Sequence, residues 1–389
     1  MTLSIKDLDL KGKKVLMRVD FNVPIDPHGN ITDDTRIRLA IPSIQYALDQ
    51  EATVILMSHF GRPDGKINPE LSLKPCADRL SELLERGVEL APDCVGEEVK
   101  HIASQLGAGE VLLLENLRFH KGEQYPEKEP AFAKELSELG DVYVNDAFGS
   151  AHRKHSSTFA ITQFFPEKSA MGLLVESELS FLSRIVLEPK RPFYAIIGGA
   201  KIGTKLGVLK ALLKKIDALF IGGGMAFTFL KGEGISIGDS ICDDEKLEEG
   251  KQLLEMCRKK GIEVYLPEDF VITNGKSVQI NRTIPQGWKG MDIGPKTVEN
   301  WSAKLEKGVT IFWNGPMGVF EEKPFSHGTH RLAQNLSMTK GTVIVGGGDS
   351  IAAINLLGLE KGFAHLSTGG GATLEFIEYG HLVGIDALS

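Results

Sequence analysis

Residues 342–357, TVIVGGGDSIAAINLL, read as a buried strand, a run of glycines, an acidic residue and the start of a helix. A glycine-rich turn between a strand and a helix presents backbone N–H groups, and the helix N-terminus adds partial positive charge. Such a turn is suited to binding phosphate. However, the lysine of a P-loop is absent, and Asp349 would repel a phosphate. The stretch therefore predicts a βα unit that needs a cation from elsewhere.

The same alternation of strand and helix runs along the whole chain. We predict buried strands at 13–21, 52–59, 110–116, 141–148, 193–199, 218–224, 309–316 and 342–348. Helical periodicity is found at 71–86, 130–140, 205–216 and 244–260. This alternation indicates βαβ units with parallel strands. We therefore expect the α/β class, with two doubly wound, Rossmann-like parallel-sheet domains.

The length of 389 residues is more than one hydrophobic core usually takes, which favours two domains. The stretch LLVESELSFLSRIVLEPKRP reads as a helix stopped by prolines, and a helix can join two domains as a hinge. We expect a central cleft between the domains. The predicted divisions are 1–172 for the first domain, 173–190 for the interdomain helix, 191–371 for the second domain and 372–389 for a segment returning to the first.

Bulk composition is that of a soluble globular protein, with 42% hydrophobic and 25% charged residues. The formal net charge of −8 argues against general binding of nucleic acid or anionic membranes. The four cysteines form no C-x-x-C pair, which suits a reducing compartment. No signal-peptide core and no apolar run of about 18 residues is present. We expect a cytoplasmic monomer.

The two halves of the chain end their strands differently, and ligands of open parallel sheets bind at those ends. In the first half the ends are polar and basic: RVDFNVP, SHFGRP, LLENLRF and NDAFGSAHRKHSS. In the second half they are rich in glycine: IGGAKIGTK, FIGGGMA, WNGPMGVFE, VGGGDS and STGGGA. The first domain is therefore predicted to bind a small, highly charged anion, and the second a nucleotide.

Basic side chains in the first half are candidates for that anion. Several guanidinium groups that converge can bind phosphate or carboxylate oxygens in pairs, although any one arginine can be a surface residue. The candidate set is Arg36, Arg62, Arg118 and Arg153. His59 and His152 accompany two of them, as hydrogen-bond partners or as catalysts. A metal pair of His152 and His155 is rejected, because no acidic or thiolate partner is spaced with them.

Two interpretations of Asp349 stay open. Aspartate is a favoured helix N-cap, and it is also a ligand for the Mg²⁺ that accompanies nucleotide phosphates. In the second case Ser350 and the glycine amides would contact phosphate directly, with positive charge from Lys201 and Lys205.

Two further glycine stretches have competing readings. GGAKIG (198–203) nearly matches a dinucleotide fingerprint, but Asp217 precedes the next strand and cannot reach a ribose. NGKS (274–277) lacks the first glycine of a Walker A motif and is better read as a hairpin turn. A nicotinamide-dependent oxidoreductase and a non-catalytic nucleotide-binding module remain the alternative classes, and the arginine set argues against the second.

The order and spacing of VDFNVP, SHFGRP, LLENLR, NDAFGSAHRKHSS, GGAK, WNGPMGVFE and GGGDS resemble the phosphoglycerate kinase family over essentially the whole chain. This resemblance implies reversible, Mg²⁺-dependent transfer of the acyl phosphate of 1,3-bisphosphoglycerate to ADP, giving 3-phosphoglycerate and ATP. It implies direct in-line transfer with domain closure, a first domain that binds 3-phosphoglycerate and a second that binds nucleotide.

The resemblance also implies site residues by position. Those expected at 3-phosphoglycerate are Asp20, Phe21, Asn22, Arg36, His59, Phe60, Gly61, Arg62, Arg118, His152 and Arg153. Those expected at the nucleotide are Gly199, Lys201, Lys205, Gly223, Asn314, Glu321, Gly347, Gly348, Asp349 and Ser350, with Glu321 at the ribose and Asp349 on Mg²⁺. The transferring phosphoryl group is expected to meet Arg36, Lys201, Gly370 and Gly371.

Overall fold

The computed structural model describes residues 2–389, which form two compact units. One unit runs to Ser180 and also contains His381–Ser389, and the other is Phe181–Gly380. Helix α6 (Leu173–Val186) contains the boundary, and the last segment divides at residue 380. The assignment of one substrate to each domain stays a prediction, and so does the cleft between the domains. No helix within residues 2–389 combines the length and apolarity that crossing a bilayer requires.

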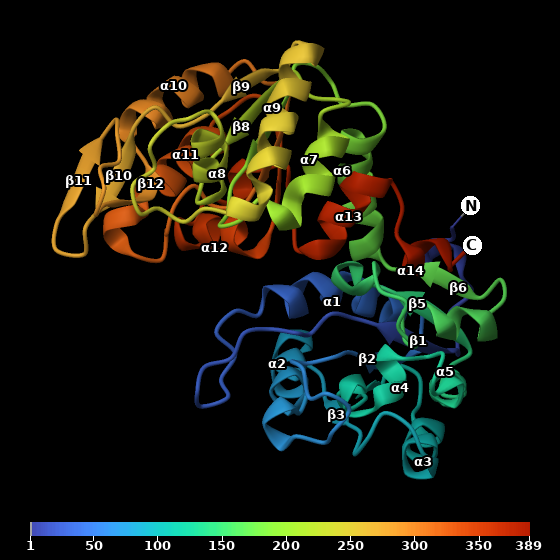
Figure 1. Ribbon diagram of the computed structural model, residues 1–389. Helices are drawn as coiled ribbons and strands as arrows, with labels where there is room; N and C mark the ends of the chain where they lie inside the picture. Colours follow the sequence, from blue (N-terminus) through green and yellow to red (C-terminus); the bar gives the residue numbers. More distant parts are fainter. Residues whose placement is uncertain (1) are drawn as a thin grey trace. The chain divides into compact units, whose positions relative to one another are not determined.

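The first unit is built on one six-stranded sheet whose neighbouring strands all pair in parallel. Its strand order is β3-β4-β2-β1-β5-β6. Figure 1 labels β1, β2, β3, β5 and β6 of this sheet. The strands are β1 (Lys14–Arg18), β2 (Thr53–Met57), β3 (Val88–Leu90), β4 (Val111–Leu113), β5 (Val142–Asn145) and β6 (Ser169–Met171). Its helices are α1 (Thr35–Asp49), α2 (Lys74–Leu84), α3 (Glu97–Gln105), α4 (Lys121–Gln124), α5 (Pro130–Ser137) and α14 (Val383–Asp386).

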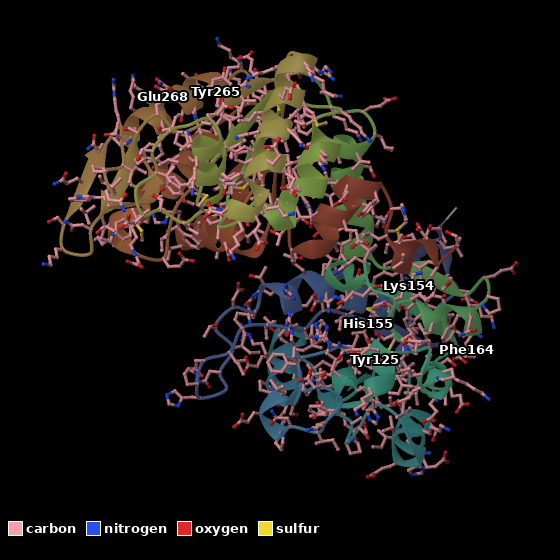
Figure 2. All side chains as sticks on the ribbon, in the orientation of Figure 1. Tyr125, Lys154, His155, Phe164, Tyr265 and Glu268 are labelled. Carbon is pink, nitrogen blue, oxygen red and sulfur yellow. The ribbon has the colours of Figure 1, made fainter. Side chains whose placement is uncertain are left out.

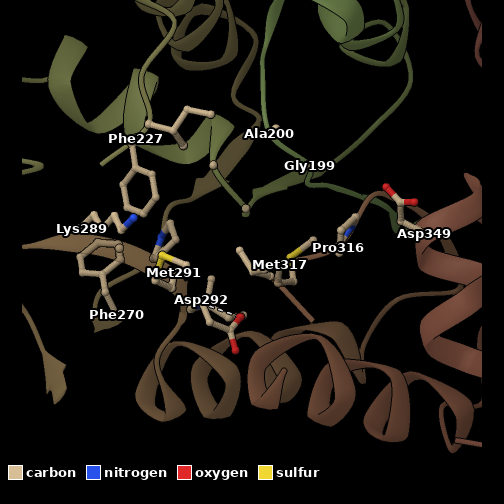
Figure 3. Close-up of a pocket in the computed structure, with 18 of the residues that line it drawn as sticks. Gly199, Ala200, Phe227, Phe270, Lys289, Met291, Asp292, Pro316, Met317 and Asp349 are labelled. Atoms are coloured by element: carbon tan, nitrogen blue, oxygen red, sulfur yellow. Dashed lines mark hydrogen bonds between the residues drawn. The ribbon is translucent and has the colours of Figure 1, made fainter. Parts of the chain in front are cut away.

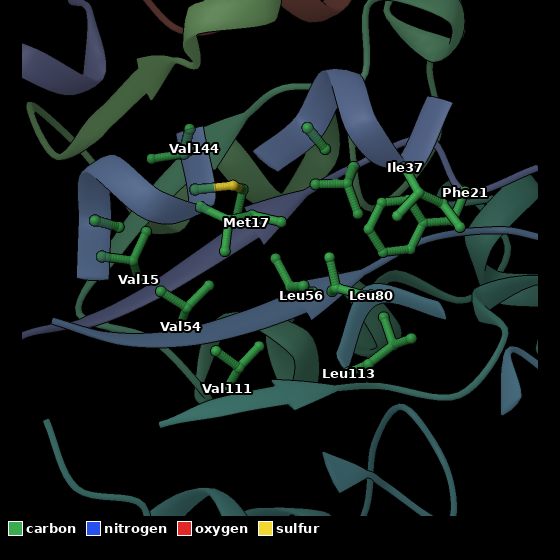
Figure 4. Close-up of a cluster of buried hydrophobic side chains, with 14 of the residues drawn as sticks. Val15, Met17, Phe21, Ile37, Val54, Leu56, Leu80, Val111, Leu113 and Val144 are labelled. Atoms are coloured by element: carbon green, nitrogen blue, oxygen red, sulfur yellow. The ribbon is translucent and has the colours of Figure 1, made fainter. Parts of the chain in front are cut away.

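The core of the first unit explains why its central strands read as continuous apolar runs. A parallel sheet covered on both faces buries successive side chains rather than alternate ones. In β1, Val15, Leu16 and Met17 are all fully buried. Figure 4 shows Val15 and Met17 in one cluster with Leu56 of β2 and Leu80 of α2. Each such side chain contributes about 1.5–3 kcal/mol relative to exposure in water.

The second unit repeats this plan with another all-parallel sheet in the order β15-β14-β13-β7-β8-β9. Its strands are β7 (Phe193–Ile197), β8 (Ala218–Ile221), β9 (Glu263–Tyr265), β13 (Thr310–Asn314), β14 (Thr342–Gly346) and β15 (His365–Ser367). Its further helices are α7 (Leu206–Leu212), α8 (Met225–Gly232), α9 (Leu247–Lys260), α10 (Pro295–Leu305), α11 (His327–Ser337), α12 (Gly348–Leu356) and α13 (Gly371–Tyr379).

A small antiparallel sheet accompanies the second unit. Strand β10 (Phe270–Thr273) lies between β11 (Val278–Asn281) and β12 (Lys289–Ile293). The NGKS stretch therefore connects two antiparallel strands, which confirms the hairpin and excludes a phosphate loop ahead of a helix.

Both parallel sheets contain a point at which the strand order reverses. The chain passes from β4 on one side of β1 to β5 on the other, and from β9 on one side of β7 to β13 on the other. Ligands of doubly wound sheets bind at the carboxyl ends of the strands beside such a point. The loops after β1 and β5, and after β7 and β13, are therefore where sites are expected.

Candidate active site

In the first unit, the loop after β1 is tied to the loop after β2 and to helix α1. Arg36 Nη1, in the first turn of α1, donates a hydrogen bond of 3.0 Å to Asp20 Oδ2. Asn22 Oδ1 accepts a 2.9 Å hydrogen bond from Gly61 N, and Asn22 N donates to Asp20 Oδ1 at 3.2 Å. Three of the predicted loop residues and Arg36 are thus assembled on one surface.

Arg118 lies in the same surface and has an unused donor. Its side chain is buried, with 4% of the residue exposed, and Nη1 donates to Gly61 O at 2.7 Å. Nε has no hydrogen-bond partner among residues 2–389. Burial, followed by the charges of Arg153 and Arg18, lowers the pKa of Arg118 to about 10. The Arg118 guanidinium is thus buried, carries an unpaired N–H and is repelled by neighbouring arginines. An anionic ligand would stabilise it.

The two histidines of this surface are held in the neutral form. Burial, reinforced by Arg18 and other arginines, keeps the pKa of His59 well below its usual value. Burial and the charge of Arg153 lower the pKa of His152 to about 4. Arg153 Nε donates to His152 Nε2 at 3.3 Å, and His152 Nδ1 is buried without a partner among the described residues. These histidines are therefore suited to hydrogen bonding rather than to proton transfer at neutral pH.

Arg18 and Glu123 are two members of this surface that the sequence did not reveal. Arg18 is fully buried at the end of β1, and its Nη2 donates to His59 Nδ1 at 3.1 Å. Its Nε donates to Ser157 Oγ at 2.8 Å, and that hydroxyl donates to Glu123 Oε1 at 2.7 Å. The only available signal was a charged residue closing the apolar run KVLMR.

Glu123 is the buried counter-charge behind the arginines. Burial works against its charge, but hydrogen bonding by His155 and the charge of Arg18 outweigh burial and hold its pKa below the usual value. His155, labelled in Figure 2, has Nδ1 at 3.6 Å from Glu123 Oε1. The sequence therefore missed an acidic partner of His155, although these residues do not form a cluster with metal-ligand spacing among residues 2–389.

Phe21 and Phe60 do not present their side chains to a ligand. Both are buried, at 0% and 3% exposure. Their N–H groups are also used, by Ser58 Oγ at 2.9 Å and by Asn116 Oδ1 at 3.0 Å. These residues shape the loops, whereas Arg62 is exposed beside them.

In the second unit, the loops after β7 and β13 are joined across the point where the strand order reverses. Gly198 N donates to Asn314 O, and Gly199 N donates to Pro316 O, each at 2.9 Å. Lys205 Nζ then bonds both loops, donating to Gly198 O at 2.6 Å and to Asn314 O at 3.3 Å. The lysine predicted from the loop sequence is thus placed at the reversal point.

Two cavities meet at these loops and share Gly199, Ala200, Pro316 and Asp349. The first, of about 450 Å³, is lined mainly by apolar side chains and glycines, among them Ile241. Figure 3 shows Phe227, Phe270, Met291 and Met317 in this lining. The second, of about 390 Å³, is lined by Lys201, Lys205, Asn314, Gly347, Gly348 and Gly370. An apolar cavity beside one with lysines and helix N-termini fits a nucleoside and its phosphates.

Asp349 is not the helix cap. Gly347, with φ of +95°, is the N-cap of α12, and no side-chain hydrogen bond caps that helix. Asp349 instead lies in the first turn, is exposed, and lines both cavities. Ser350 is fully buried, and its hydroxyl accepts a 2.8 Å hydrogen bond from Gly315 N. In this structure the Ser350 hydroxyl joins two loops as an acceptor, and its contact with phosphate stays a prediction.

The remaining predicted residues fall into two groups. Glu321 is exposed and lines the apolar cavity, as does Gly223. Gly370, with φ of +53°, is the N-cap of α13, and Gly371 is the first residue of that helix.

Asp217 accepts a 2.7 Å hydrogen bond from Phe193 N and pairs with Arg191, so it anchors the start of β7. That placement removes the acid which a dinucleotide fingerprint needs.

If Lys205 contacts the nucleotide phosphates as predicted, nucleotide binding should depend on pH. Burial lowers its pKa to about 8, although the charge of Asp349 works in the opposite direction. Nucleotide affinity is expected to fall as pH rises through and above about 8, because a neutral amine no longer attracts phosphate. Calorimetric titration with ADP at several pH values measures this. Lys205→Arg should flatten the profile, whereas Lys201→Arg, at an exposed position, should leave it in place.

Stability of the ligand-free protein should change in the opposite sense. The folded-state pKa of Lys205 lies below the ordinary lysine value of 10.5, so the unfolded chain binds more protons between about pH 8 and that value. This group therefore makes folding more favourable as pH rises through that window. A profile of affinity that rises with pH would contradict the assignment of Lys205 to phosphate.

Comparison with known proteins agrees with this geometry. The family model described as phosphoglycerate kinase matches residues 5–380. The chain is 49% identical to a phosphoglycerate kinase of Koribacter versatilis, over 100% of this chain and 99% of that protein. It is 46% identical to one of Pseudothermotoga lettingae, over 100% and 98%.

Solved structures give the same result. The phosphoglycerate kinase of Coxiella burnetii superposes with a TM-score of 0.88 at 38% identity, covering 100% of this chain and 99% of that one. The enzyme of Pyrococcus horikoshii superposes with a TM-score of 0.88 at 31% identity, covering 99% and 98%. The chain therefore belongs to the phosphoglycerate kinase family and is a glycolytic phosphotransferase that acts on small-molecule substrates, with a carboxyl group as acceptor.

Proposed function

We propose that this enzyme transfers the acyl phosphate of 1,3-bisphosphoglycerate directly to Mg·ADP, reversibly, in the cytoplasm and as a monomer. The observation that carries the proposal is the pair of adjoining cavities in the second unit, because they match the two chemical parts of a nucleotide. The arginine surface of the first unit supports the other substrate, since Arg118 Nε and His152 Nδ1 are buried without partners among the described residues.

The residues fit a reaction that needs no general base. An acyl phosphate is already activated, so catalysis rests on positioning and on neutralising the equatorial oxygens of the phosphoryl group. Arg36, Lys201 and the amides at Gly370 and Gly371 are proposed to do this. The neutral histidines are consistent with it, because no step requires them to accept a proton.

Asp349 fits the role of a magnesium ligand. Its carboxylate is exposed, lines both cavities and does not cap α12. Mg²⁺ takes one or two carboxylates together with phosphate oxygens. When bound, the ion would supply charge neutralisation at the nucleotide phosphates. Asp349 itself would hold the ion, while Lys205 holds the loops on which the phosphates rest.

A coupled assay with 3-phosphoglycerate and Mg·ATP tests the proposal. Formation of ADP that requires both substrates is the expected result. ADP protection against thermal unfolding, without protection by NAD, would exclude the oxidoreductase class. Full activity in excess chelator would remove the metal from the proposal, and ATP binding without turnover would favour a binding module.

Asp349→Ala is expected to weaken Mg·ADP binding and to leave 3-phosphoglycerate binding nearly intact. The carboxylate belongs to the nucleotide cavities, and the arginine surface lies in the other compact unit. Calorimetry with each ligand separately measures both effects, and Asp349→Asn keeps the shape while removing the charge. Glu360→Ala, which removes an acid outside both cavities, is the control. Equal loss for both ligands would indicate a folding defect instead.

Domain closure is proposed to bring the two substrates together. Reacting atoms must come within about 3–3.5 Å of each other, with water excluded. The residues predicted to bind the two substrates belong to separate compact units. Residues 173–190, which include helix α6, connect these units. Both ligands together are therefore expected to reduce the radius of gyration more than either ligand alone. Small-angle scattering measures this, and an unchanged radius with both ligands bound would contradict closure.

A further inference from the structure

Three metal-ligating side chains meet in the first unit, outside the substrate surface described above. Asp93 and Cys94 lie in the loop after β3, and His120 follows the short turn after β4. Strands β3 and β4 are parallel neighbours, so their loops emerge at the same edge of the sheet. One ligand atom from each residue lies within 4.8 Å of the others. Of the residues that the structure describes, only these form such a group.

The three side chains differ in their exposure to solvent. Cys94 is fully buried, whereas the side chains of Asp93 and His120 are 36% and 29% exposed. Asp93 Oδ1 accepts hydrogen bonds of 2.6 Å from His120 Nε2 and from Cys94 N. The thiol is therefore at the inner end of the group, and the carboxylate and imidazole lie on its solvent side.

We propose that Asp93, Cys94 and His120 bind a thiophilic divalent cation, with Zn²⁺ the best match. Thiolate and imidazole select zinc and its first-row neighbours, whereas Mg²⁺ requires oxygen ligands. Three protein ligands and an open fourth position are a common arrangement for zinc. The site contains none of the residues proposed above for substrate binding, nucleotide binding or phosphoryl transfer.

The geometry needs only a small adjustment. Tetrahedral zinc with ordinary bond lengths separates two ligand atoms by about 3.3–3.6 Å. The pair Asp93 Oδ1 and His120 Nε2 must open from 2.6 Å by less than about 1 Å, which a side-chain rotation supplies. The other separations are at most 4.8 Å, so each needs to close by no more than about 1.5 Å.

Neighbouring contacts hold the ligands in place. His120 stacks on Phe132, with ring centroids 5.2 Å apart. Asp93 O accepts a hydrogen bond of 3.3 Å from Glu115 N, which joins the loop after β3 to the end of β4. Contacts of this kind orient metal ligands. Because His120 follows Arg118 by two residues, an ion here would also brace the turn that carries Arg118.

Titration of the metal-free, reduced protein with Co²⁺ alone tests the proposal. Co²⁺ replaces Zn²⁺ in tetrahedral sites, and a Co–thiolate bond gives a charge-transfer absorption band. One equivalent is expected to produce the band, and Zn²⁺ is expected to abolish it. Cys94→Ser and His120→Gln should each weaken binding at least about 100-fold, which is the upper range for losing even a supporting residue of a metal site.

Matched variants keep the result decisive. Cys242→Ser and His101→Gln remove the same residue types elsewhere and should bind Co²⁺ like the unaltered protein. Asp349→Ala should also bind normally, which separates this site from the nucleotide site. His120 is partly exposed, so His120→Gln serves if Cys94→Ser fails to fold. Absence of the band in the unaltered protein, or an undiminished band in His120→Gln, would overturn the proposal.

Discussion

Arg36→Ala is expected to lower kcat by about 10³–10⁵, the range seen when an arginine that stabilises a transferring phosphoryl group is removed. Only Nη1 of Arg36 has a partner among the described residues, Asp20 at 3.0 Å, and the side chain is 34% exposed. Its other donors are therefore available to a ligand. The proposed role is to meet charge that develops on the phosphoryl oxygens, so kcat should change far more than nucleotide affinity.

Arg38→Ala is the matched control, because Arg38 lies in the same helix and pairs with Asp34 at 2.8 Å. It should retain nearly full kcat. Steady-state kinetics with each substrate varied in turn separates kcat from both KM values. If Arg36→Ala keeps most of its kcat and raises only the KM for 3-phosphoglycerate, Arg36 positions the substrate and does not act in the transition state.

Gly223→Ala is expected to abolish nucleotide binding and to lower the melting temperature by at least roughly 4 °C. Gly223 has φ of +65°, where a side chain costs about 1–3 kcal/mol. A Cβ would also lie 2.6 Å from Gly199 N and 2.8 Å from Pro316 O. These atoms belong to the loops that both cavities share, so the loops must move apart. For a domain of this size, 1 kcal/mol corresponds to about 2–4 °C.

Gly348→Ala provides the comparison within the same site. A Cβ at Gly348 would meet nothing within 4 Å, and its backbone does not have positive φ. Its melting temperature should therefore be nearly unchanged, while ADP affinity falls if phosphate occupies the cavity it lines. Thermal scanning with and without ADP measures both variants. A fully stable Gly223→Ala protein that binds ADP would show that these loops are not packed as described.

The sequence alone determined the class of fold and most of the loops that line the two cavities and the arginine surface. Apolar runs such as VLM in β1 are local signals, because a strand buried on both faces must be apolar throughout. Glycine runs after strands are equally local, since backbone conformation at one residue limits which residue can stand there. For this reason the runs FIGGGMA and VGGGDS could be singled out from the sequence, and the structure gives Gly223 and Gly347 within them positive φ values.

The short strands at the sheet edges were not predicted from the sequence. Strands β3, β6, β9 and β15 have three residues each, too few for a periodic pattern to be distinguished from a loop. Their pairing depends on a neighbouring strand far along the chain, as β9 depends on β8. Helix α7 also ends at Leu212, earlier than the apolar periodicity of 205–216 indicated.

Only the tertiary structure decided which side chains contact one another at the sites. Arg18 reaches Ser157, 139 residues away, and through it Glu123, so a charge at a strand end became part of a buried network. Ser350, which local reasoning placed at the phosphate, also accepts a hydrogen bond from Gly315, in the loop after β13. Hydrophobic period and backbone conformation are properties of neighbouring residues, whereas burial and charge pairing depend on which distant segments the topology brings together.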